Sequence, residues 1–253
     1  MEKGGITLGC VVAVVSGKGG TGKTSVCAGV SIALAQEGKQ VLVIDCDVGL
    51  RNLDISLGMS DCAALSFLDV SEGGYGLYQA PRHPEFPTLT FLTAPMNRSM
   101  DKIDTRAFAD LMYNARNSYD YILLDAPAGV DVGFHMVSDA ADRFLVVTGP
   151  GPAAIRDASR VGELLELKGK TDVRMVVNRV NKTMLSLLKL TIDDVMDRSG
   201  LPLIGVVLED ADVPLAAACG MSLVRYSRRS YAANAFRKIA KRIQGFTEPI
   251  TLR

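Results

Sequence analysis

A glycine-rich segment directly follows an apolar run near the start of the chain, and it reads Gly17-Lys18-Gly19-Gly20-Thr21-Gly22-Lys23-Thr24. Its spacing, a glycine, four residues and then Gly-Lys-Thr, is that of a phosphate-binding loop between a strand and a helix. Glycines let successive backbone N–H groups face a phosphate, and the N-terminus of the following helix adds partial positive charge. We expect Lys23 to reach the β and γ phosphates and the Thr24 hydroxyl to bind Mg²⁺. The segment, extended by Ser25, therefore predicts a nucleoside triphosphate site.

Lys18 is not required by this pattern, because Lys23 already neutralises phosphate charge. A second lysine inside the loop can support the charge that develops in a transition state, across a subunit interface in the manner of an arginine finger. The alternative is an ordinary solvated lysine of the loop. We favour the first interpretation, because Lys18 lies within the phosphate-binding segment.

Carboxylates follow two other apolar runs. Asp45 and Asp47 come at the end of one run, and Asp125 ends another. Ligands of open α/β sheets bind at the carboxyl ends of the strands, so these acids are expected near the phosphate loop. We assign Asp125 and Asp45, with Thr24, to Mg²⁺, partly through water. Asp45 or Asp47 is also a candidate to orient the attacking water, and strand alternation allows only one of them to point directly into the site. The alternative for each acid is a solvated residue at a strand end.

The segment after Asp125 has the composition of a switch loop. It reads Asp125-Ala126-Pro127-Ala128-Gly129, and Gly129 is placed to respond to a γ phosphate.

The elements that must position these residues alternate along the chain. Short runs that are apolar on both faces predict buried parallel strands at 10–16, 41–45, 120–125, 143–148, 173–180 and 203–208. Helical periodicity predicts helices over 25–37, 157–167 and 185–198, and residues 69–88 are expected to form a surface loop. The pattern predicts an α/β fold: one domain over 1–253, with tails 1–8 and 246–253, in which a doubly wound, mostly parallel sheet has helices on both faces.

Composition excludes several classes of protein. The chain has 28 Lys+Arg and 28 Asp+Glu, no Trp and 6% aromatic residues. Scarce aromatic residues argue against a base-stacking single-strand binder, and the zero balance argues against bulk electrostatic capture of nucleic acid. No apolar run has the length needed to cross a bilayer. The five cysteines form no CxxC pair, which is typical of reduced thiols, so we expect a cytoplasmic protein.

The charges are nevertheless segregated along the chain. Residues 221–253 contain one acid, Glu248, and eight basic residues, Arg225, Arg228, Arg229, Arg237, Lys238, Lys241, Arg242 and Arg253. The favoured interpretation is a last packed helix, over 232–246, with a solvated basic face. A face attracted to anionic lipid and a face for non-specific DNA contact are the two alternatives.

Several motifs resemble the ParA/MinD family of ATPases. Residues 18–24 resemble its deviant Walker A motif, in which the early lysine is the signature residue. Residues 45–54 and 125–129 resemble the two switch segments of the septum-site-determining branch of that family. Residues 155–160 and the Val177-Asn178-Arg179 strand end also resemble family segments.

This resemblance implies an ATPase that uses ATP/ADP and Mg²⁺ and dimerises with ATP between its subunits. It implies that Lys18 contacts the partner's nucleotide and that Asp47 assists the catalytic water. It also implies that Asn178, with Arg179 beside it, contacts adenine, and that the segment after Glu209-Asp210 closes over the base. The expected switch residues are Asp47, Gly49, Pro127 and Gly129. The implied function is spatial regulation of the division site, with regulators of the MinC/MinE type as possible partners.

Some features depart from the family pattern. Residues 149–154 lack the usual Pro-Glu, and residues 216–220 replace a polar stretch. Residues 245–253 are too short and too Pro-interrupted for the membrane-targeting helix that usually follows the fold, so a membrane surface remains an open partner and DNA an unfavoured one. No cysteine lies in 126–140, which argues against an iron–sulfur relative. A paralogue that positions flagella, pili or DNA, and an ATP-binding adaptor with negligible hydrolysis, remain alternatives.

Overall fold

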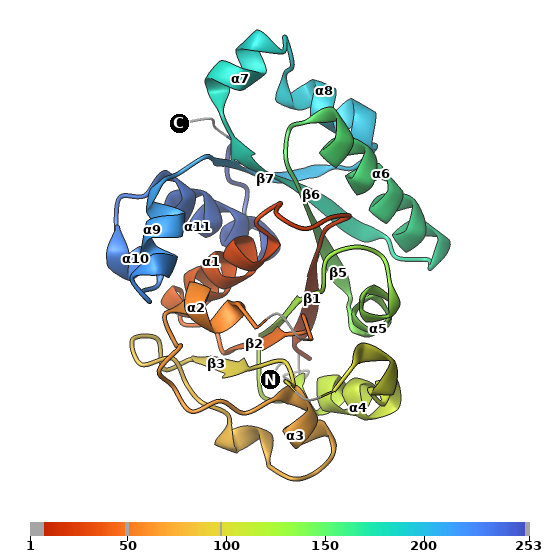
Figure 1. Ribbon diagram of the computed structural model, residues 1–253, viewed down its shortest axis with the longest axis vertical. Helices are drawn as coiled ribbons and strands as arrows, with labels where there is room; N and C mark the ends of the chain where they lie inside the picture. Colours follow the sequence, from red (N-terminus) through yellow and green to blue (C-terminus); the bar gives the residue numbers. More distant parts are fainter. Residues whose placement is uncertain (1–7, 49–50, 97, 251–253) are drawn as a thin grey trace, which may run out of the picture.

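A seven-stranded sheet forms the centre of the molecule. The computed structural model describes residues 8–48, 51–96 and 98–250. Within these residues the strands are β1 (Cys10–Val15), β2 (Val41–Asp45), β3 (Leu89–Leu92), β4 (Tyr121–Asp125), β5 (Arg143–Thr148), β6 (Asp172–Val180) and β7 (Leu203–Leu208). Their order is β3-β2-β4-β1-β5-β6-β7, and every pairing is parallel (Figure 1). The predicted doubly wound sheet is confirmed.

Helices cover both faces of the sheet, as predicted. On one face lie α1 (Lys23–Gln36), α2 (Leu53–Leu57), α9 (Asp212–Ala218), α10 (Leu223–Tyr226) and α11 (Tyr231–Ile243) (Figure 1). On the other face lie α3 (Phe67–Ser71), α4 (Thr105–Ala115), α5 (Val132–Ala140), α6 (Pro152–Leu167), α7 (Lys182–Leu187) and α8 (Ile192–Ser199). Short 3-10 turns follow α3 at Leu77–Gln79 and precede α4 at Met100–Lys102.

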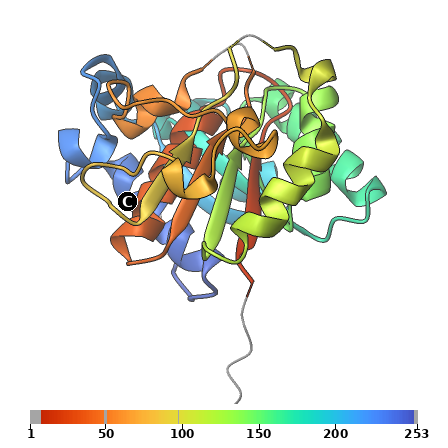
Figure 2. The ribbon, with the colours of Figure 1, turned by 90° about the horizontal axis from the view of Figure 1, so that it is seen from below.

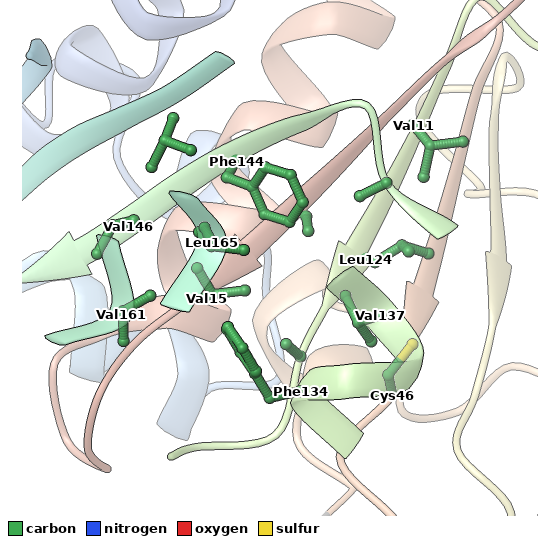
Figure 3. Packing of buried hydrophobic residues seen from close by; sticks show 14 of the residues in the cluster. Val11, Val15, Cys46, Leu124, Phe134, Val137, Phe144, Val146, Val161 and Leu165 are labelled. Carbon is green, nitrogen blue, oxygen red and sulfur yellow. The ribbon is translucent and has the colours of Figure 1, made fainter. Parts of the chain in front are cut away.

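The core on the α5 and α6 side is made of aromatic and branched side chains. Phe134 of α5 and Phe144 of β5 pack with Val161 and Leu165 of α6 (Figure 3). Each of these side chains is at most 1% exposed. Burial of one such side chain stabilises the fold by about 1.5–3 kcal/mol, so this layer holds α5 and α6 against the sheet.

The structure contains elements that the sequence pattern does not predict, and it divides one predicted helix. Residues 69–88 lie largely at the surface, as expected of a surface loop, and include the end of α3 and the turn at Leu77–Gln79. They lead into β3, a strand that was not predicted, which pairs with β2 and is fully buried. The helix predicted over 185–198 is two helices, α7 and α8. The chain breaks at Lys189, whose φ is 51°, and Thr191 caps a new helix by accepting a hydrogen bond from the Asp194 N–H.

The last helix has the predicted amphipathic packing. Phe236, Ile239 and Ile243 of α11 are buried against α1 and β7, while Arg237 and Lys241 are exposed. Gly29 of α1 allows this approach, since a Cβ there would overlap the Phe236 ring. No helix among the described residues is long and apolar enough to cross a membrane. Residues 1–7 and 251–253 of the predicted tails lie outside the described residues.

Candidate nucleotide-binding site

The phosphate loop begins at the carboxyl end of β1. This strand lies between β4 and β5, where the order of the sheet reverses direction and where ligands of open α/β sheets bind. Gly20 and Gly22 have φ of 81° and 85°, a region that other residues rarely adopt. Gly22 is the N-cap of α1, and no side chain caps this helix end. The helical periodicity predicts that this helix begins at Ser25. In the structure α1 begins at Lys23, so its first turn includes Lys23 and Thr24.

Backbone donors of this loop are unpaired. In the described part of the chain, no backbone N–H from residue 18 to residue 25 has an acceptor, and the first that does is Val26, which donates to the Gly22 carbonyl at 3.0 Å. The buried Thr21 hydroxyl also has no partner. A Cβ at Gly20 would meet no atom within 4 Å. Buried polar groups in native proteins are normally paired, so these donors fit an anionic ligand such as a chain of phosphates.

Lys23 and Asp125 form a buried ion pair beside the loop. The Lys23 ammonium lies 2.9 Å from Asp125 Oδ1, and the two side chains are 7% and 1% exposed. Burial alone lowers the pKa of Lys23, but the charge and the hydrogen bond of Asp125 outweigh it, so this pKa is raised. Lys23 is therefore a fixed cation at the start of α1.

The described residues fit a magnesium site that depends on the ligand. They contain no cluster of three or more His, Cys, Asp or Glu side chains able to hold a metal by themselves. Thr24 lies half-buried in the first turn of α1, and Asp125 lies at the adjacent strand end. Mg²⁺ is usually held by one or two such groups together with phosphates and water. When bound there, the ion would neutralise phosphate charge.

Asp45 and Asp47 differ in what their carboxylates do. Asp45 is 1% exposed and accepts hydrogen bonds from the N–H groups of Asp47 (2.9 Å), Asn52 (3.3 Å) and Leu53 (3.2 Å). Burial and the neighbouring Asp125 raise the pKa of Asp45 to about 7. Asp47 is half-buried, and no described residue donates a hydrogen bond to its side chain. Burial raises the pKa of Asp47, against the opposing charge of Lys23.

Asp45 thus holds the segment after β2 in place, and the Asp47 carboxylate is uncommitted. This difference favours Asp47 over Asp45 as the residue that meets water. The metal role predicted for Asp45 and the catalytic role predicted for Asp47 stay predictions. Gly49, the predicted switch glycine, lies outside the described residues.

The segment after β4 returns to the phosphate loop. Gly129 has a φ of 90°, and its N–H donates to the Ser16 carbonyl at 3.1 Å. Pro127 packs on Gly133 in the first turn of α5, where a Cβ would overlap the proline ring. The two predicted switch residues of this segment are thus held by different elements, Pro127 by α5 and Gly129 by the residue that precedes the phosphate loop.

Lys18 is exposed and lightly held. Its ammonium lies 3.7 Å from Asp157 Oδ2 of α6, and its side chain is 46% exposed. Gly17 packs against the same residue, because a Cβ there would lie 2.7 Å from the Asp157 carbonyl oxygen. The sequence placed Asp157 in a family-like segment but did not predict this contact with the loop.

A cavity of about 470 Å³ adjoins the other side of the loop. Gly20, Gly22 and Ser25 line it from the loop side. Asn178 and Arg179 line it from the end of β6, and residues 209–211, 213 and 214 line it from the loop after β7. The size and the mixed lining are those of a small-molecule site.

Asn178 and Arg179 also orient the phosphate loop. The Asn178 amide donates to the Thr21 carbonyl at 2.8 Å, and the Arg179 guanidinium donates to the Gly20 carbonyl at 2.9 Å. Arg179 has a φ of 56°. The structure thus brings both residues to the loop and the cavity, while their predicted contact with adenine stays a prediction.

Asp210 is a further site residue, for which the sequence indicates no role of its own. Its carboxylate accepts from the Ser230 hydroxyl (2.7 Å) and the Ala232 N–H (3.0 Å) at the start of α11. The N-cap serine before a helical stripe was a visible signal, but its link to a residue 20 positions earlier was not.

The site combines a strand, a loop with unpaired backbone N–H groups, a helix, and a carboxylate on the neighbouring strand. This arrangement defines a P-loop nucleoside triphosphatase. Residues 12–224 match the CobQ/CobB/MinD/ParA nucleotide-binding domain. The chain is 39% identical to a putative septum site-determining protein MinD of Guillardia theta, over 93% of this chain and 88% of that protein. It is 35% identical to the septum site-determining protein MinD of Synechocystis, over 93% and 89%.

Solved structures agree with these sequence relatives. MinD in a MinC:MinD complex of Aquifex aeolicus has a TM-score of 0.88 and 34% identity, over 96% of this chain and 98% of that one. MinD of Pyrococcus horikoshii, complexed with Mg-ADP, has a TM-score of 0.82 and 29% identity, over 93% and 96%. The chain belongs to the MinD family of septum site-determining ATPases. The family resemblance read from the motifs is confirmed, and with it the predicted fold and ATPase class.

Proposed function

We propose that this chain is a Mg²⁺-dependent ATPase that dimerises around ATP and, as that dimer, regulates where the septum forms. The observation that carries the proposal is the row of unpaired N–H groups in residues 18–25, which runs directly into the 470 Å³ cavity. A nucleotide has the two parts that such a site needs, an anionic chain and a flat base.

Each polar group of the site then has a task. The loop N–H groups and Lys23 bind the phosphates, and Thr24 with Asp125 holds Mg²⁺, with Asp45 behind them. Asp47 orients water, since its carboxylate is uncommitted. Asn178 and Arg179 border the base. The Mg-ADP complex of the P. horikoshii relative supports this assignment of ligands.

Lys18 is the residue that we assign to the dimer. An exposed lysine in the loop, held only by a 3.7 Å ion pair to Asp157, can leave that partner at small cost. A second subunit that brings its triphosphate to the ammonium would replace Asp157 as the counter-charge. ATP then favours the dimer, because ADP lacks the phosphate that Lys18 would contact.

A MinC-type protein is the partner that we propose. Support comes from the MinC:MinD complex of A. aeolicus, whose MinD shares 34% identity with this chain. We propose the cytoplasm as the site of action, with reversible binding to the inner face of the membrane as a second step. The exposed Arg225, Arg228, Arg229, Arg237 and Lys241 near the C-terminus support an anionic surface.

The dimer is tested by light scattering with Mg-ATP and with Mg-ADP, together with phosphate release. The wild type is expected to dimerise only with ATP. Lys18→Ala is expected to bind nucleotide and stay monomeric, because the contact across the interface is lost. Asp47→Ala is expected to dimerise and release phosphate about 100-fold more slowly. Lys39→Ala, a lysine of the turn after α1, is the control. An ATP-induced dimer of Lys18→Ala would refute the role across the interface.

Membrane binding is tested by co-sedimentation with phosphatidylglycerol vesicles. We expect pelleting with Mg-ATP, less with Mg-ADP and little at high salt, because doubling the basic surface in a dimer strengthens electrostatic attraction. Duplex DNA added as a competitor separates the two anionic surfaces. Retention on DNA with no pelleting on vesicles would contradict the membrane step and favour a partition role.

A further inference from the structure

The loop after β7 forms one wall of the 470 Å³ cavity. Glu209, Asp210, Ala211, Val213 and Pro214 all line it. The start of this loop is held beside β6: the Glu209 N–H donates to the Val180 carbonyl at 3.0 Å, and the Glu209 carboxylate accepts from the Asn181 amide at 3.2 Å. The Val213 N–H donates to the Asp210 carbonyl at 3.2 Å, which is a contact within the loop. Glu209, Ala211 and Pro214 are exposed. The contacts beside β6 act on Glu209 alone, so the position of the rest of the wall depends on a further contact.

The Asp210 carboxylate supplies that contact. One oxygen accepts from the Asp212 N–H at 3.0 Å, which shapes the loop itself. The other accepts from the Ser230 hydroxyl at 2.7 Å and from the Ala232 N–H at 3.0 Å. Partial burial would raise the pKa of Asp210, but these hydrogen bonds outweigh it and the pKa is lowered, so the group is ionised at neutral pH. Hydrogen bonds to an ionised acceptor are about twice as strong as neutral ones.

The partner of this carboxylate is a firmly packed helix end. Ser230 is 3% exposed and also accepts from the Ala233 N–H at 3.1 Å, so it caps α11 and donates to Asp210 at once. The partial positive charge of the helix N-terminus adds to the attraction. Further along α11, Phe236 packs on Gly29 of α1 and Ile239 packs on Gly205 of β7, which fixes the helix in place. Phe236 itself lines the cavity.

Two walls of the cavity thus depend on α11. Phe236 belongs to the helix, and the loop at 209–214 is held to its first turn through Asp210. Figure 1 shows α9 and α11 beside α1 on one face of the sheet, and α11 contacts both α1 and the edge strand β7. The phosphate loop lies on the other side of the cavity and makes no hydrogen bond to Asp210 in the described residues.

We propose that Asp210 is a positioning residue for base recognition: by holding the loop after β7 against the N-terminus of α11, it sets the width of the base cavity and leaves phosphate binding unaffected. The proposal rests on the function proposed above, since it takes the cavity to be the base site. It makes the helix that carries the basic C-terminal residues a structural part of nucleotide recognition. By reciprocity, a bound base strengthens the cap of α11.

The test compares a ligand that has a base with one that has none. Mg-ADP and Mg-pyrophosphate are titrated by calorimetry into the wild type, Asp210→Ala and Ser230→Ala. The expected result is that ADP binds about tenfold more weakly to each variant, whereas pyrophosphate affinity changes by less than about twofold. The double variant is expected to lose no more than the larger single effect, because both substitutions break one contact.

Asp104→Ala is the matched control. Asp104 is also a carboxylate at a helix N-cap, and it accepts from the N–H groups of Arg106 (2.8 Å) and Ala107 (3.3 Å) at the start of α4. It lines none of the cavity at the phosphate loop. The control is expected to shift the urea midpoint to a similar extent as Asp210→Ala, with ADP affinity unchanged. A second readout is hydrogen exchange at the Ala232 and Ala233 amides, which ADP is expected to slow and pyrophosphate is not.

Two outcomes would overturn the positioning role. One is an equal loss of ADP and pyrophosphate affinity in Asp210→Ala, which would indicate a general structural effect. The other is unchanged ADP affinity in both single variants. A wild type that binds ADP no more tightly than pyrophosphate would instead overturn the base site itself, and with it the function proposed above, so the two failures are distinguishable.

Discussion

The two edges of the β-sheet hold their charges in different ways. At the carboxyl edge, Lys23 and Asp125 form a buried ion pair whose side chains are 7% and 1% exposed. At the amino edge, one carboxylate, Asp172, binds two arginines, with Oδ2 3.1 Å from Arg143 Nε and Oδ1 3.0 Å from Arg174 Nε. All three of these side chains are a third or more exposed. Figure 2 shows β1 beginning at the lower edge of the molecule, below the region where the loops gather.

This difference in exposure separates the ion pairs that bear on function from those that do not. Exposed pairs are solvated and screened, and each contributes about 0–1 kcal/mol. A buried pair has lost its water, so removing one partner leaves the other uncompensated. The two exposed ion pairs of Asp172 therefore constrain the amino edge less than the buried pair of Lys23 and Asp125 constrains the carboxyl edge.

Neutralising one carboxylate at each edge has the largest expected effect. Asp125→Asn leaves Lys23 buried without its counter-charge and is expected to lower the free energy of unfolding by about 3 kcal/mol. Asp172→Asn is the matched control and is expected to cost less than about 1 kcal/mol. Urea denaturation of both variants without nucleotide measures the difference. Equal losses would contradict the distinction between the edges.

The same substitution carries a pH signature. Burial and Asp125 raise the pKa of Asp45 from 3.8 to about 7, so the folded protein holds this proton more tightly than the unfolded chain. The resulting stabilisation is fully present below pH 3.8 and is lost as the pH rises through about 7. Asp125→Asn removes one cause, so the pKa of Asp45 is expected to fall and this pH dependence to shrink. Carboxyl carbon NMR shifts measure that pKa, and an unchanged value would show that Asp125 does not act on Asp45.

A smaller effect is expected from a glycine-to-alanine substitution at two turns, one in the phosphate loop and one outside it. Gly22 and Gly38 have similar φ, 85° and 78°, so alanine strains both by about 1 kcal/mol. At Gly22 the new Cβ would also overlap the Asn178 amide, whereas at Gly38 it would meet nothing within 4 Å. Gly22→Ala is expected to weaken ADP binding about tenfold, and Gly38→Ala by less than about twofold. Calorimetry measures both, and equal affinities would mean that the loop adapts.

Local parts of the site could be predicted from the sequence. The phosphate loop, the acids after β2 and β4 and the strands that carry them are contiguous motifs, so neighbouring residues suffice to indicate them. The strand β3 could not be predicted, because it is four residues long and is identified by pairing with β2 rather than by its own periodicity. The split between α7 and α8 depends on one backbone angle at Lys189.

Long-range contacts account for the rest of what was missed. Lys18 contacts Asp157, and Asp210 contacts Ser230, and in both pairs the residues are ordinary for their positions. The different roles of Asp45 and Asp47 could not be predicted either. Alternation along a strand indicates that one acid points inward, but it does not indicate which carboxylate already accepts backbone hydrogen bonds.

The hydrogen bonds from Asn178 and Arg179 to the phosphate loop affect how a nucleotide binds. These side chains hold the carbonyl oxygens of Thr21 and Gly20, which fixes the peptide planes of the loop and the direction of its N–H groups. The conformational entropy of ordering the loop is therefore lost when the chain folds, and little remains to be lost on binding. Once the domain has folded, the phosphate loop is therefore already in the conformation that binds phosphate.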